Sequence, residues 1–170
     1  MKTLIAGVDR GLAVLAGLAL CASFVSVALG VVARLAGWDL PGTDAYAGYA
    51  IAAALFLALP QTLRRQEHIR VTLLLEKVPP RGRSVLQWWS LCAGLALALF
   101  LAFYALRLVW TSHAMHDVSQ GADATPLWIP QIAMALGCIG FALSMVDALW
   151  CRWRGAAYFQ RIGAEAAHVE

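Results

Sequence analysis

Hydrophobic residues form four long stretches along the chain, and polar residues gather between them. The stretches cover residues 11–33, 45–63, 85–110 and 128–150. Arg107 interrupts the third stretch and Asp147 the fourth. A helix rises about 1.5 Å per residue, so about 20 apolar residues cross the hydrocarbon core of a bilayer. The pattern predicts an all-α membrane protein with four transmembrane helices, in which residues 1–170 form a single membrane domain.

Tryptophan residues stand near the expected ends of these helices. They are Trp38, Trp88, Trp89, Trp110, Trp128, Trp150 and Trp153. An indole ring is favoured at the membrane–water interface, because most of its surface is apolar and its N–H is polar. Tryptophans scattered through a soluble core would not follow the boundaries in this way.

The composition excludes a water-soluble monomer. Of the 170 residues, 61% are hydrophobic and 14% are charged, against about 45–50% and about 25% in ordinary soluble domains. The net charge of +3 is too small to indicate a nucleic-acid partner. Membrane lipids are the expected surroundings.

Basic residues predict the orientation in the membrane. Of the thirteen Lys and Arg residues, eleven fall on one proposed side: Lys2, Arg10, Arg64, Arg65, Arg70, Lys77, Arg81, Arg83, Arg152, Arg154 and Arg161. Cytoplasmic segments carry an excess of Lys and Arg. Both termini, the middle connection and the tail at 154–170 are therefore expected in the cytoplasm, with residues 34–44 and 111–127 outside.

The middle connection has a pattern of its own. Apolar residues recur at helical spacing between residues 66 and 78, charged residues fill much of the rest, and Pro79-Pro80 would end any helix. This predicts a short amphipathic helix at the cytoplasmic interface, between the second and third transmembrane helices. Just before it, Pro60 predicts a kink or an early end of the second helix.

Two charges inside the hydrophobic stretches are candidate structural charges. Asp147 lies one turn from Trp150, which favours a paired or interfacial carboxylate over a coupling or partner-binding role. Arg107 lies one turn from Trp110, so its long side chain is expected to reach the outer head groups.

Enzymatic and metal-binding chemistry has little support. His113 and His116 would share one face of a helix, but two ligands are weak evidence for metal, and a solvated outer connection is preferred. The four histidines lie away from the centres of the stretches, which disfavours haem ligation. The four cysteines stand alone in the sequence, as apolar packing residues do. We expect no catalytic residues, no metal and no cofactor.

Two segments resemble a known family. The second stretch ends in Arg64-Arg65-Gln66-Glu67-His68-Ile69-Arg70-Val71, and the fourth begins with Pro126-Leu127-Trp128-Ile129-Pro130. Together with Asp44 at the start of the second stretch, these motifs resemble the small permease subunit (DctQ-like) of tripartite ATP-independent periplasmic (TRAP) transporters. Two positions depart from the family pattern: Thr72 replaces a frequent Asp, and Asp44 is a single acid where many members have two.

The resemblance implies a function as part of a complex. The chain would support a large multi-span permease that works with a periplasmic solute-binding protein to import small organic acids with sodium. The large subunit would carry the ion and substrate sites, and this chain would enlarge the stationary scaffold. The candidate partner contacts are Asp44, Arg65, His68, Arg70 and Pro130.

Two other functions remain to be compared with this one. A membrane anchor or assembly subunit of a redox complex would also be a four-helix protein without catalytic residues of its own. A small autonomous exporter is disfavoured, because the first hydrophobic stretch carries no carboxylate.

Overall fold

The computed structural model describes residues 2–38, 40–64, 80–121 and 123–154. Four long helices make up most of this part: α1 (Lys2–Ala36), α2 (Thr43–Arg64), α4 (Pro80–Ala114) and α5 (Trp128–Trp153). All four are long and apolar enough to cross a membrane. The predicted all-α, four-span fold class is therefore confirmed, whereas the amphipathic helix predicted within 66–78 lies outside the described residues.

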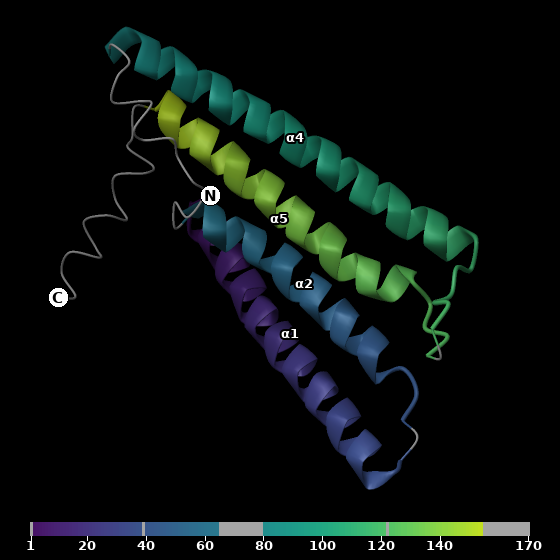
Figure 1. Ribbon diagram of the computed structural model, residues 1–170. Coiled ribbons are helices and arrows are strands. Elements are labelled where there is room, and N and C mark those ends of the chain that lie inside the picture. Colours follow the sequence, from purple (N-terminus) through teal and green to yellow (C-terminus); the bar gives the residue numbers. More distant parts are fainter. Residues whose placement is uncertain (1, 39, 65–79, 122, 155–170) are drawn as a thin grey trace, which may run out of the picture.

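Helix α5 holds the structure together. It packs against α4, α2 and α1, and α1 also packs along α2, while α4 and α1 lie at opposite edges of the assembly (Figure 1). In the most apolar window of α5, 50% of residues are buried, compared with 17% in α1 and in α4. Large apolar side chains such as Phe24 and Phe103 consequently face outward, where lipid or another protein can cover them.

Short side chains let α4 and α5 approach each other. Ala102 and Ala105 of α4 pack with Ala135 and Cys138 of α5 in one buried cluster. A second cluster joins Ala98 of α4 to Ala142 and Met145 of α5 and also includes Leu63 of α2. Small residues are common where membrane helices meet, because they allow close backbone packing and many van der Waals contacts.

Helix α2 does not end at Pro60 but continues to Arg64. Proline has no N–H, so the carbonyl of Phe56, four residues earlier, loses its usual helical donor. At that carbonyl α5 lies against α2: a Cβ added to Gly137 would overlap the Phe56 carbonyl group. Helix α2 therefore continues through Pro60 at the place where Gly137 lets α5 pack over the turn that lacks a hydrogen bond.

Three helices meet just beyond this crossing. A Cβ added to Gly140 of α5 would lie 3.0 Å from Cγ of Pro60 and would overlap the side chain of Leu12 in α1. We call this region the three-helix junction; it comprises Asp9 and Leu12 of α1, Phe56 and Pro60 of α2, and Gly137, Gly140 and Ser144 of α5.

Candidate functional site

A cavity of about 240 Å³ opens where α1 passes into α2. Its walls are Gly30, Ala33, Arg34, Trp38, Leu40, Pro41, Gly42, Thr43 and Asp44. Gly37 and Gly42 have φ of 71° and 86°, a left-handed conformation that glycine adopts without steric cost. These two glycines let the chain reverse direction over the short distance between the two helices.

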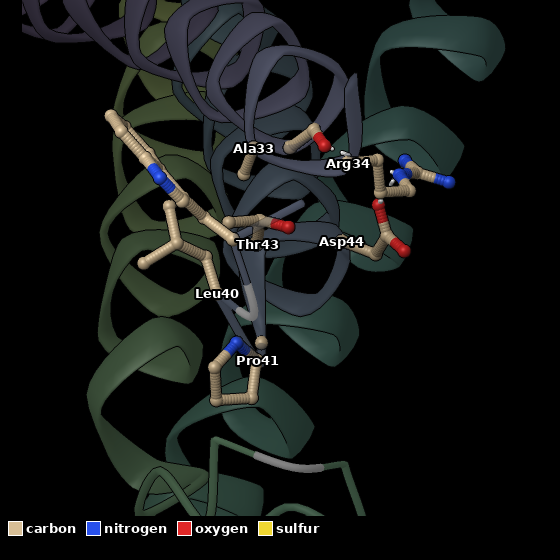
Figure 2. Close-up of a pocket in the computed structure, with 9 residues that line it drawn as sticks. Ala33, Arg34, Leu40, Pro41, Thr43 and Asp44 are labelled. Atoms are coloured by element: carbon tan, nitrogen blue, oxygen red, sulfur yellow. Dashed lines mark hydrogen bonds and ion pairs between the residues drawn. The ribbon is translucent and has the colours of Figure 1, made fainter. Parts of the chain in front are cut away.

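An ion pair lies at one side of this cavity. Nη2 of Arg34 is 3.7 Å from Oδ1 of Asp44, and the two side chains are 69% and 85% exposed. Nε of Arg34 also donates to the carbonyl oxygen of Gly30, at 3.2 Å. In Figure 2 the two charged groups face each other, and Leu40 lies on the other side of Thr43. The cavity thus joins exposed charges to an apolar wall, a combination suited to contact with another protein.

The connection between α4 and α5 is fastened to α2 beside this cavity. Tyr49 of α2 donates to Oδ2 of Asp123 at 3.2 Å, and Ser119 donates to Oδ1 of Asp123 at 2.9 Å. Hydrogen bonding by Thr125 lowers the pKa of the Asp123 carboxyl; desolvation opposes this, and Ser119 adds to the lowering. We call the cavity between α1 and α2 the outer cavity. The residues Arg34, Asp44, Tyr49, Ser119 and Asp123 are together called the outer connections.

The two histidines lie at the end of α4 and beyond it. Helix α4 ends at Ala114, so His116, with φ of 54°, is outside the helix. The two rings are stacked with centroids 6.5 Å apart, and the His113 ring meets Trp128 edge-on at 5.4 Å. No group of three potential metal ligands occurs among the described residues.

Asp9 forms a buried polar contact that the sequence analysis missed. Its side chain is 2% exposed, and the fully buried Ser144 of α5 lies 3.1 Å and 3.2 Å from its two carboxylate oxygens. The hydrophobic stretch at 11–33 contains no carboxylate, but α1 begins before it, at Lys2, and so includes Asp9. The signal was present: Asp9, Leu12 and Ala16 follow helical spacing and share the buried face.

The predicted site residues fall at both ends of the structure. Asp44 lies at the outer cavity, and Pro130 lies, partly buried, in the first turn of α5. Arg107 is exposed on α4. Asp147 is 4% exposed and lies one helical turn from Ser144, near the other end of α5. Arg65, His68 and Arg70 lie outside the described residues.

Comparison with known proteins identifies one family. The family model described as "Tripartite ATP-independent periplasmic transporters, DctQ component" matches residues 23–155. This match covers well over half of the chain, runs from within α1 to just beyond α5, and includes both segments on which the resemblance rests. Searches of curated proteins and of solved structures gave no match.

Proposed function

Because the chain belongs to the DctQ-component family of tripartite ATP-independent periplasmic transporters, we propose that it is the scaffold subunit for a large permease. The family makes it a component of a transporter, and its four apolar helices make it an integral protein of the inner membrane. The observation that carries the proposal is the family match, which extends from within α1 through α5. In this role the chain has no catalytic function of its own.

The arrangement of the helices supports a stationary role. Helix α5 is braced on three sides by close contacts that involve glycine and alanine, and such packing resists sliding of one helix along another. Helices α1 and α4 present broad apolar faces. One or both of these faces would pack against the large permease, and lipid would cover the remainder.

The proposed orientation assigns different partners to the two ends. With the termini in the cytoplasm, the outer cavity would face the periplasm, and Asp44 and Pro130 would contact the large permease or the solute-binding protein. On the cytoplasmic side, Arg65, His68 and Arg70 follow α2 and would contact the large permease. Arginine at position 70 can make a two-pronged contact that lysine imitates poorly.

Reconstitution in liposomes tests the division of labour. The purified chain alone should transport nothing. The same chain combined with the large permease and the binding protein should take up a small organic acid when a sodium gradient is applied. Liposomes holding only the large permease and the binding protein form the control and should show little uptake. Sodium-driven uptake by this chain alone would overturn the proposal.

Cysteine labelling tests the orientation. Arg81→Cys and Gln120→Cys are introduced separately after Cys21, Cys92, Cys138 and Cys151 have been replaced by serine or alanine. An impermeant thiol reagent added to intact cells should label position 120 and leave position 81 unlabelled until the cells are opened. The opposite result would invert the proposed topology.

Co-purification tests the motif that follows α2. Arg70→Lys and His68→Ala should reduce recovery of the large permease with this chain, whereas Arg81→Ala and Arg83→Ala should reduce it much less. Unchanged recovery with Arg70→Lys, together with loss in the Arg81 and Arg83 variants, would show that the segment acts through its total charge.

A further inference from the structure

We propose that the interface between α4 and α5 binds the head group of an anionic phospholipid at the end where α4 begins. We call this interface the α4–α5 seam. The site rests on the proposed orientation, which places this end in the cytoplasmic leaflet. Arg152 of α5 reaches across the seam, and its Nη2 donates to Oγ of Ser84 in α4 at 3.1 Å. One turn of α4 separates Ser84 from the start of the helix at Pro80.

A second guanidinium lies at the same end of α5, against a different neighbour. Arg154 follows the last residue of α5, and its Cζ lies 4.8 Å from the ring centroid of Trp150. A guanidinium over an aromatic face is stabilised by the electron-rich ring. Both arginines are therefore fixed by neighbours that leave most of their N–H groups available, since each guanidinium carries five.

The basic residues where α4 begins and α5 ends favour binding of an anion. The first turn of α4 contains no acidic residue but includes Arg81 and Arg83 in its sequence. Among the described residues, the guanidinium contacts of Arg152 and Arg154 are those with Ser84 and Trp150. By sequence, this end of α4 and α5 carries Arg81, Arg83, Arg152 and Arg154 against one carboxylate, Asp147. The net positive charge favours binding of a phosphate.

The surroundings favour a lipid over a soluble phosphate. Trp89 of α4 and Trp153 of α5 are 69% and 72% exposed, and exposed indoles are favoured at the level of the head groups. Val85, one turn before Trp89 on α4, is also 69% exposed. An amphiphile could thus place its phosphate at Arg152 and lay its acyl chains along this apolar strip, as lipids do in basic pockets between membrane helices.

Native mass spectrometry of the full-length chain in detergent tests the proposal with added phosphatidylglycerol and, separately, phosphatidylcholine. Phosphatidylglycerol should bind more tightly. Arg152→Gln should weaken its binding by about fivefold, the contribution expected of one basic residue at a head group. Arg152→Lys should weaken binding by a smaller factor, because the charge stays but the fork-shaped contact is lost. Ser84→Ala, which frees the guanidinium, is the mildest variant.

Arg10→Gln is the matched control. Arg10 is exposed on α1 at the same end of the molecule, so its loss removes the same charge without touching the α4–α5 seam. Equal effects of Arg10→Gln and Arg152→Gln, or equal binding of the two lipids, would overturn the proposal. Full displacement of phosphatidylglycerol by glycerol phosphate at similar concentration would overturn the assignment to a lipid. The measurement needs no partner subunit, so its failure would leave the proposed transport function standing.

Discussion

The three-helix junction and the outer connections use the same kind of side chain in opposite settings. At the junction, Asp9 is 2% exposed and its carboxylate accepts a hydrogen bond from the hydroxyl of a fully buried serine. At the outer connections, the Asp44 carboxylate is 85% exposed and faces an arginine that is 69% exposed. Loss of a partner from a buried polar group costs about 1–3 kcal/mol, whereas an exposed ion pair contributes about 0–1 kcal/mol. The junction therefore sets the stability of the fold, and the outer connections are available for function.

Gly137→Leu should break the junction and have the largest effect. Any side chain at this position overlaps the backbone of α2 at Phe56, and backbone can yield only if the helices separate. Overpacking costs about 1–3 kcal/mol and sometimes more, so we expect about 3 kcal/mol or a loss of folded protein. Chemical unfolding in detergent measures this. Gly17→Leu is the control, because a Cβ at Gly17 meets nothing within 4 Å; equal losses would contradict the close crossing.

Ser144→Ala tests the polar part of the junction. The substitution removes the hydroxyl that contacts both oxygens of Asp9, and we expect a loss of about 1–3 kcal/mol in the free energy of unfolding. Ser23→Ala is the matched control: Ser23 is also buried, but its hydroxyl donates within its own helix, to the carbonyl of Leu20. A double-mutant cycle of Ser144→Ala with Asp9→Asn should show coupling; additive effects would show that the two side chains act independently.

The four membrane-spanning helices could be predicted from the sequence because each depends on a local property. A bilayer requires about 20 apolar residues in a row, and the chain satisfies this four times. The junction depends instead on residues far apart in the chain, such as Phe56 and Gly137, and no local pattern says which helices meet. Asp9 was missed for a related reason. A charged residue lowers the local hydropathy, so the predicted stretch began after Asp9, at residue 11, whereas in the folded protein this side chain is buried against α5.

The outer connections were less predictable than the helices. Asp123 was assigned to a solvated connection, but its contacts with Tyr49 and Ser119 tie that connection to α2. The spacing of His113 and His116 suggested a shared helix face, yet α4 ends between them at Ala114. Hydrogen bonds among loop residues determine where Asp123 and His116 lie. The hydrophobic periodicity and the charge pattern of the sequence do not reveal these bonds.

Asp123→Asn and Tyr49→Phe should loosen the connection between α4 and α5 without unfolding the helices. Hydrogen–deuterium exchange over residues 117–126 should become faster in both variants. The pKa of Asp123 is lowered in the folded protein. Its ionised carboxylate therefore makes its full contribution to stability at pH values above the unfolded pKa of about 3.9. The contribution is lost as the pH falls through the still lower folded pKa. Exchange that is unchanged in Tyr49→Phe would show that the Tyr49 contact does not hold the connection.

Arg34→Gln and Asp44→Asn should have the smallest effect on stability, about 0.5 kcal/mol or less, because both side chains are exposed and their pairing is screened by water. The same two variants should reduce co-purification of the large permease or uptake that depends on the binding protein, if the outer cavity is a contact surface. Charge reversal of both residues in one chain separates the alternatives, since it restores the internal pair while inverting the charges offered to a partner. Recovery of uptake in this double variant would make the pair structural, and continued loss would make it a contact for a partner. A large fall in stability with either single variant would remove the contrast with the three-helix junction.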